Sequence, residues 1–224
     1  MSKSASAAVR AVSTTQQDDC YQTLRQWVTV GRFLPGERLK IRDVAAELGV
    51  GLMPVRATLQ RLAAEGALVN VPNAGVTVPH LSRVEFDDVL NVRLLLEGEA
   101  AERGSLRLTA ADQAGLHDLS QHMAVALSVS DAKGYLQANE EFHLRLYRAA
   151  GSPTLLALIE TVWLKVGPLS NRLFDHADAL RVLNDAHEDV LQAIAVRDSA
   201  AVRRGVERDL FVAGQFLRLA CQGK

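Results

Sequence analysis

The stretch GVGLMPVRATLQRLAAEGALVNVPNAGVTV, residues 49–78, carries the clearest fold signals in this chain. Pro54 stands where a helix can begin, because the first turn of a helix leaves its backbone N–H groups unpaired in any case. Apolar residues then recur at helical spacing until Gly66. Two short runs of β-type residues, ALVNV and GVTVP, follow and are joined by PNAG. The stretch therefore predicts a helix followed directly by a small β-hairpin.

Two more helices are predicted before this one. Between Asp18 and Arg32 the apolar residues follow one helical face, until two glycines and a proline interrupt the pattern in GRFLPGERL. The segment IRDVAAELG predicts a short helix that ends at Gly49. The tight turn LGVGLMP joins it to the helix that starts near Pro54. Three helices followed by a two-stranded wing are typical of a winged helix-turn-helix, whose last helix lies in the major groove of DNA.

The predicted third helix carries polar residues opposite its apolar stripe. Among them, Arg56 can bond guanine through two donors, and Gln60 can pair with adenine in the same way. Thr58 is a further candidate on that helix, and Arg42 on the preceding helix can reach phosphates or groove edges. The PNAG tip has no bulky side chain, so its backbone can approach a phosphate. The alternative is a small packed subdomain whose arginines are only solvated.

Composition limits the class of protein. The chain has 224 residues, of which 48% are apolar and 23% charged, and it has no apolar run long enough to span a membrane. The first segment, residues 1–17, is rich in Ser, Ala and Thr without the apolar core of a signal peptide, so we expect a flexible tail there. Cys20 and Cys221 lie near opposite ends and form no C-x-x-C pair, which suits a reducing cytoplasm. We therefore expect a cytoplasmic protein without a membrane partner.

Charge and periodicity divide the chain into a DNA-binding domain over 18–80 and a second domain over 81–224. Residues 1–80 hold nine Lys or Arg against six Asp or Glu, whereas the remainder is acidic. The second part is a succession of amphipathic segments with Ser, Thr or Asp near most of their starts. These segments cover residues 82–104, 109–129, 131–150, 153–172, 178–197 and 198–221. The sequence therefore predicts a mostly α protein, with an all-α antiparallel bundle that can hold a ligand or metal between helices.

Four polar residues fall in apolar stretches of the predicted bundle. Asn139 and His143 are four residues apart and share one helical face, while His187 and Asp209 lie on later segments. Imidazole and oxygen donors from three helices can meet around one metal ion. The alternative for each residue is an ordinary paired or solvated side chain.

The front part resembles the winged-helix domain of the GntR superfamily of bacterial transcription regulators. The resemblance rests on PGERL, LGV, PVR, LQRLAAEG and PNxGVxV in the family's order and spacing. It implies that Arg42 and Arg56, together with Gly75 of the wing, contact DNA. Two arginines common in the family are absent, because Leu52 and Ala74 stand at their places. These departures bear on the affinity and on the operator sequence.

The rear part resembles the FCD domain, the ligand-binding domain of the FadR-like branch. Asn139, His143 and His187 match that domain's ligand pattern, and Asp209 stands where its last histidine is usual. The resemblance implies one divalent ion held by these four residues. Replacing an imidazole by an oxygen donor makes Mn or Mg more competitive with Zn or Ni. The VRxxLE match implies that Arg93 faces the same cavity and pairs with a carboxylate effector, with a structural role for Glu97.

The prediction is a DNA-binding transcription regulator, a repressor that binds a palindromic operator as a homodimer and releases it when a small organic acid enters the helical domain. A second interpretation keeps DNA binding but makes the rear site purely structural. A third is a metal-dependent helical hydrolase, because His117 and Asp118 are adjacent. That pair needs further ligands at spacings which the sequence does not offer, so no enzyme is expected. His117, His122 and His176 are interpreted as surface or packing residues.

Overall fold

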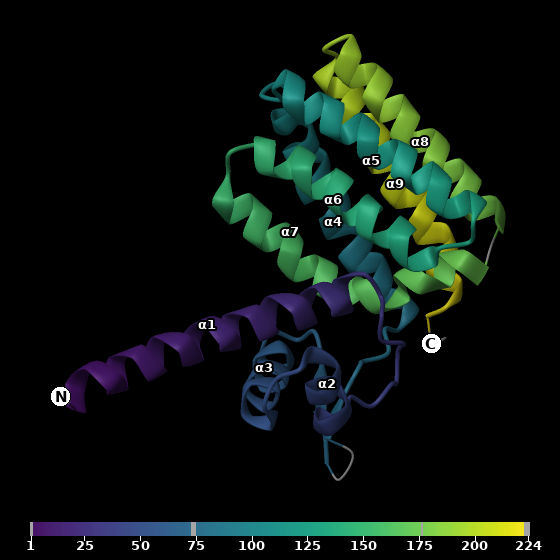
Figure 1. The fold of residues 1–224 in the computed structure, drawn as a ribbon. Helices are drawn as coiled ribbons and strands as arrows, with labels where there is room; N and C mark the ends of the chain where they lie inside the picture. Colours follow the sequence, from purple (N-terminus) through teal and green to yellow (C-terminus); the bar gives the residue numbers. More distant parts are fainter. Residues whose placement is uncertain (1, 73–74, 176, 222–224) are drawn as a thin grey trace.

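The computed structural model describes residues 2–72, 75–175 and 177–221, with segments 2–15 and 177–183 described by their backbone. Figure 1 shows a small front domain beside a helical bundle. The front domain holds α1 (Ser2–Thr29), α2 (Ile41–Leu48), α3 (Leu52–Ala64), β1 (Val69–Val71) and β2 (Gly75–Thr77). The bundle holds α4 (Arg83–Ser105), α5 (Ala110–Ser128), α6 (Ala132–Ala149), α7 (Pro153–Val166), the 3-10 helix η1 (Gly167–Asp175), α8 (Ala177–Ala195) and α9 (Ser199–Leu219). The predicted mostly α architecture is confirmed.

The front domain is built from local signals that the sequence contains. Gly49 ends α2 in the left-handed region at φ 65°, where a glycine avoids the steric cost of a side chain. The strands pair antiparallel, with Asn70 opposite Val76. The loop before α2 also joins this sheet, because Arg38 forms a bridge with Thr77. The hairpin therefore has a third backbone partner that fixes it against the helices.

The first helix differs from the sequence expectation. The segment over 1–17 was expected to be a flexible tail, whereas α1 is one helix from Ser2 to Thr29. The segment contains four alanines and neither Gly nor Pro, so nothing in it stops a helix that continues into the packed part. Its packed part lies against α3, where Leu24 and Val28 share a buried core with Leu59.

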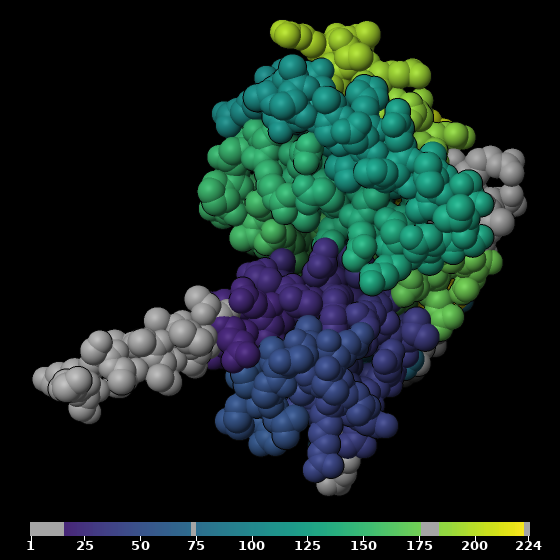
Figure 2. Space-filling model, in the orientation of Figure 1, coloured from purple at the N-terminus to yellow at the C-terminus, as the bar shows by residue number. Residues whose placement is uncertain are grey.

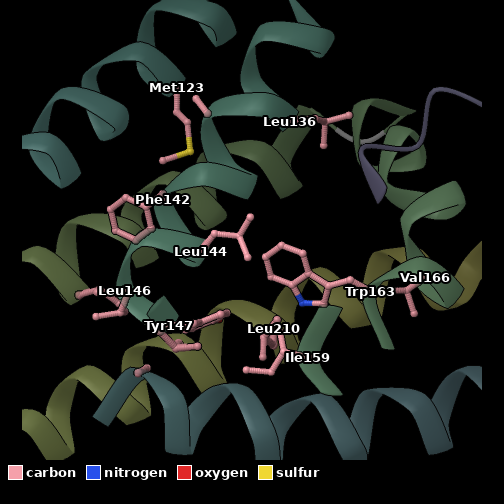
Figure 3. Close-up of a cluster of buried hydrophobic side chains, with 14 of the residues drawn as sticks. Met123, Leu136, Phe142, Leu144, Leu146, Tyr147, Ile159, Trp163, Val166 and Leu210 are labelled. Atoms are coloured by element: carbon pink, nitrogen blue, oxygen red, sulfur yellow. The ribbon is translucent and has the colours of Figure 1, made fainter. Parts of the chain in front are cut away.

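Capping residues explain where the bundle helices begin. Ser82 caps α4 and Thr109 caps α5, each in a reciprocal capping box with the acidic residue three positions later. The segment expected as one helix over 153–172 is divided, because α7 ends at Val166 and η1 follows. The cause is Pro168, whose ring and missing N–H disfavour a continued α-helix. Phe142, Tyr147, Trp163 and Leu210 lie in the core of the bundle (Figure 3).

The last turns of α1 connect the two domains. In Figure 2 the purple atoms of α1 lie between the blue front domain and the green part of the bundle. Asn171 of η1 donates a hydrogen bond to the Gly31 carbonyl, and Gln26 donates one of 3.4 Å to Glu140 of α6. Arg25 forms an ion pair of 3.4 Å with Glu160 of α7. Among the residues described, no helix is long and apolar enough to cross a membrane.

Candidate functional site

An exposed cleft of the front domain lies between α2, α3 and the hairpin. It is lined by four of the predicted DNA-binding residues, namely Arg42, Arg56, Gln60 and Gly75. All four are exposed, and neither Arg42 nor Arg56 forms an ion pair with another described residue. The two guanidinium groups are therefore available to a negatively charged partner. Leu52, at the place of a family arginine, lines the same cleft, whereas Ala74 lies outside the described residues.

The structure contradicts the prediction that Thr58 contacts DNA. Its side chain is 1% exposed, and its hydroxyl donates to the Cys20 Sγ of α1 over 3.5 Å. Thr58 lies on the same face of α3 as Val55 and Leu62, with which it shares the helical spacing of three to four residues. That spacing was visible in the sequence and indicated a buried position.

Sequence reasoning missed Arg38, Lys40 and Asn70, which also line the cleft. Arg38 is exposed and lies against the wing, because a Cβ atom at Gly75 would be 3.8 Å from the Arg38 guanidinium. The cause is the bridge between Arg38 and Thr77, which pairs residues 39 positions apart. The position of Arg38 in PGERL suggested only a connecting loop. In the fold this arginine provides a positive charge at the base of the wing.

Three of the four predicted metal ligands come together in the bundle. His143 of α6, His187 of α8 and Asp209 of α9 each offer a donor atom, and these atoms all lie within 4.8 Å of one another. His143 Nε2 is 3.3 Å from Asp209 Oδ2 and 3.4 Å from His187 Nε2. The three residues, called the His–His–Asp cluster below, are at most 6% exposed. Their helices converge because α8 and α9 pack closely against each other, and α6 and α9 both pack against α4.

Burial and mutual contact set the charges of this cluster. Burial lowers the pKa of His187 to about 4, opposed by Asp209 and reinforced by His143, so this imidazole is neutral at neutral pH. Burial alone would raise the pKa of Asp209, but the close contact with His143, the neighbouring His187 and Arg93 lower it overall. The cluster therefore combines one carboxylate with a neutral imidazole, which are the protonation states that bind a metal ion.

The chemistry of the cluster fits a divalent ion better than a closed hydrogen-bond network. The nearest neighbours of His143 Nε2 are a carboxylate oxygen and a second imidazole nitrogen, all of which carry lone pairs in their metal-binding forms. His187 Nδ1 is buried without a hydrogen-bond partner among the described residues. Three converging electron-pair donors of N and O type form a usual set for a transition metal.

A cavity of about 80 Å³ opens beside the His–His–Asp cluster. This central cavity is large enough for several water molecules or a small ligand. Its wall includes Asn139, His143 and Asp209, so the fourth predicted ligand lies at the same cavity. Thr29 and Val30, at the end of α1, also line it. The cavity thus has one wall in the bundle and another on the helix that packs against α3.

Arg93 also lines the central cavity. Its Nε donates to Glu97 Oε1 over 2.6 Å, and its Nη2 donates to Oε2 over 3.3 Å. Glu97 is 1% exposed and also accepts a 3.0 Å hydrogen bond from Tyr147. Arg93 is therefore held by a buried carboxylate while it lines the cavity, and Glu97 accepts hydrogen bonds from both Arg93 and Tyr147.

The remaining histidines do not extend the cluster. His117 and His122 are exposed on α5, in agreement with their interpretation as surface residues, and His176 lies outside the described residues. Among the described residues, the His–His–Asp cluster is the one group of three or more His, Cys, Asp and Glu side chains whose donor atoms converge closely enough to hold a metal ion. The His117–Asp118 pair, on which the hydrolase interpretation depended, thus has no further ligand in the part of the chain that is described.

The fold and the two sites define a winged helix-turn-helix protein with a helical ligand-binding domain. Residues 16–78 match the gntR family of bacterial regulatory proteins, and residues 88–210 match the FCD domain. The chain belongs to the GntR family, in its FadR-like branch with an FCD domain. It is a DNA-binding transcription regulator with an effector-binding domain, and its domains and relatives are regulators rather than enzymes.

Known relatives cover nearly the whole chain. The HTH-type transcriptional regulator McbR of Escherichia coli K12 is 28% identical over 197 residues, which span 87% of this chain and 88% of McbR. The HTH-type transcriptional repressor GlaR of the same strain is 25% identical over 219 residues, spanning 92% of this chain and 97% of GlaR. The solved structure of E. coli McbR/YncC has a TM-score of 0.85 at 26% identity and covers 91% of this chain and 97% of that one.

Proposed function

We propose that this regulator binds a palindromic operator as a homodimer through α3 and the wing, and that it represses transcription from the bound site. Arg42, Arg56 and Gln60 line one exposed cleft, which supports contact with phosphates and base edges. Two-fold symmetric dimers bind two half-sites related by the same symmetry, so a palindrome is the expected operator. GlaR and RspR, both named transcriptional repressors, support the direction of regulation. A bacterial regulator of this type works in the cytoplasm.

The effector in this proposal is a small carboxylate that enters the central cavity. Arg93 lines the cavity and offers a positive charge, and its pairing with Glu97 holds it in place. His143, His187 and Asp209, with Asn139 beside them, would hold one divalent ion. When bound, this ion supplies a second positive charge for the effector's carboxylate. The mixed N and O donor set leaves Zn, Ni, Mn and Mg as candidates.

The proposed coupling of effector binding to DNA binding rests on one observation. Thr29 and Val30 form part of the cavity wall, and the helix that they end packs against α3. A ligand in the cavity therefore contacts the same helix that supports the DNA-binding surface. A ligand that binds one arrangement of α1 more tightly shifts the population toward it, which is the requirement for allosteric control.

A thermal-shift screen of small carboxylates, with and without divalent ions, tests the effector site. A carboxylate that binds the native state raises the melting temperature by mass action, and we expect the largest rise when metal and acid are both present. The same acid should weaken binding of the full chain to a labelled palindromic DNA in a fluorescence titration. A regulator that binds DNA but responds to no carboxylate in either condition would favour the effector-independent alternative, in which the rear site is structural.

A further inference from the structure

A line of buried polar groups leads away from the His–His–Asp cluster. Tyr147 lies one turn after His143 on α6, and its hydroxyl is 3.1 Å from His143 Nδ1. The same hydroxyl is 3.0 Å from Glu97 Oε2 on α4. His143, Tyr147 and Glu97 are each at most 3% exposed. Arg93 ends the line, because it donates to both carboxyl oxygens of Glu97.

The chemistry of these groups fixes the direction of each hydrogen bond. Both oxygens of Glu97 accept hydrogen bonds from the Arg93 guanidinium, and a carboxylate can only accept. A tyrosine hydroxyl carries its proton at neutral pH, because its ordinary pKa is about 10. Tyr147 therefore donates its single O–H to Glu97. Its oxygen can then only accept from His143, whose Nδ1 must carry the proton.

We propose that Tyr147, held by Glu97, is a positioning residue that keeps the His143 proton on Nδ1 and leaves Nε2 able to bind a divalent ion. The inference rests on the metal site of the proposed function and extends it to residues outside the ligand set. His143 Nε2 is the atom that faces Asp209 and His187, at 3.3 and 3.4 Å. Hydrogen bonds of this kind to the second nitrogen of a ligating imidazole fix its tautomer and its orientation.

Loss of the Tyr147 hydroxyl has a defined consequence for His143. Nδ1 would lose its acceptor, whereas Nε2 would still face the Asp209 carboxylate at 3.3 Å. The tautomer with the proton on Nε2 then becomes the favoured one, because that proton can bond to Asp209. A proton on Nε2 competes with a metal ion for the same lone pair.

The chain provides a matched control for this test. Tyr135 is on the same helix, is 1% exposed and lines the central cavity, but its hydroxyl has no hydrogen-bond partner among the described residues. Tyr147→Phe and Tyr135→Phe therefore remove the same atom from similar surroundings. Both variants and the wild type are titrated as full-length, metal-free protein with Zn²⁺ in competition with a chromophoric chelator, at one fixed pH. We expect Tyr147→Phe to bind Zn²⁺ roughly 10–100-fold more weakly, and Tyr135→Phe to match the wild type.

A second measurement reports the proton directly and needs no metal. In the metal-free protein labelled with ¹⁵N-histidine, two-bond ¹H–¹⁵N spectra should show His143 protonated on Nδ1 in the wild type and in Tyr135→Phe. In Tyr147→Phe the proton should move to Nε2. A wild-type His143 with a bare Nδ1, or equal Zn²⁺ affinities for the two variants, would overturn the role of Tyr147. A wild type that binds no Zn²⁺ contradicts the ion of the proposed function, and the spectra still decide where Tyr147 places the proton.

Discussion

Arg56 lies exposed near the start of α3, at the edge of the cleft and without an ion pair among the described residues. Replacing it by Ala should weaken operator binding by about 1–3 kcal/mol, the scale of one good base contact. The stability should hardly change, because no core contact is lost. Thr58→Val is the matched control on the same helix. Because Thr58 is buried, this substitution should leave DNA affinity unaltered. Equal operator affinity of Arg56→Ala and the wild type, titrated at fixed salt, would contradict docking through this face.

Arg38 is expected to act on DNA without regard to sequence. It lies beside the wing, where a phosphate rather than a base edge is the natural partner of a guanidinium. Arg38→Gln should therefore weaken binding to operator and random DNA alike, and reduce the slope of log affinity against log salt by about one. Arg103→Gln removes an equal charge from α4 in the bundle, where Arg103 pairs with Glu99, and should leave the slope unchanged. A similar change of slope in both variants would mean that only net charge matters.

At the scale of elements, the end of α1 is held against η1 by close backbone contact. A Cβ atom at Gly31 would lie 2.6 Å from the Gly167 carbonyl oxygen, and Gly31 has a φ of 70°. Gly31→Ala thus combines left-handed strain of about 1–2 kcal/mol with a steric clash. Gly49→Ala has nearly the same φ, 65°, but nothing within 4 Å, so it should show the strain alone. Urea denaturation should find Gly31→Ala the less stable variant. If both variants lose the same free energy of unfolding, α1 and η1 can separate at no cost.

The contact between α1 and α6 should respond to pH. Burial raises the pKa of Glu140 to about 7, reinforced by Glu141 and opposed by Gln26, Arg25 and Arg148. The unfolded chain releases this proton near pH 4.3 and the folded protein near 7, so Glu140 destabilises the fold increasingly as the pH rises between these values. Glu140→Gln should therefore gain stability relative to the wild type on going from pH 5 to pH 7.5, in metal-free protein. The lowered pKa of His187 makes the fold more stable as the pH rises, which is the opposite effect. His187 is present in both proteins, so its contribution cancels in the comparison. If the difference in unfolding free energy between Glu140→Gln and the wild type is the same at pH 5 and pH 7.5, Glu140 does not titrate at this contact in that range.

At the scale of the whole molecule, the two functional sites lie in separate hydrophobic cores. His187→Gln should therefore lower metal content and abolish the response to a carboxylate, while operator binding without effector stays within about threefold of the wild type. Elemental analysis and a DNA titration with and without the acid measure both properties. Loss of DNA binding in a folded variant would show that the cluster supports the front domain directly.

Much of the fold follows from local sequence signals. Gly49 and Pro54 mark the turn of the helix-turn-helix, and Ser82 and Thr109 begin two bundle helices, because caps and breakers act through neighbouring backbone groups. The family motifs also identified the class of protein. Asn139 and His143 were placed on one face by their spacing alone, since residues four apart on a helix are neighbours.

The sequence by itself thus determined the order of helices, the small hairpin after the helix-turn-helix and the chemical types available at each site. Only the tertiary structure decided that His187 and Asp209 meet His143 and that Arg38 reaches the wing. It also decided that Tyr147 contacts both His143 and Glu97. These pairs are tens of residues apart, so no local preference brings them together. Their contacts depend on how α4, α6, α8 and α9 pack and on the bridge to β2. Local backbone chemistry sets the elements, whereas burial of their apolar faces sets which distant side chains become neighbours.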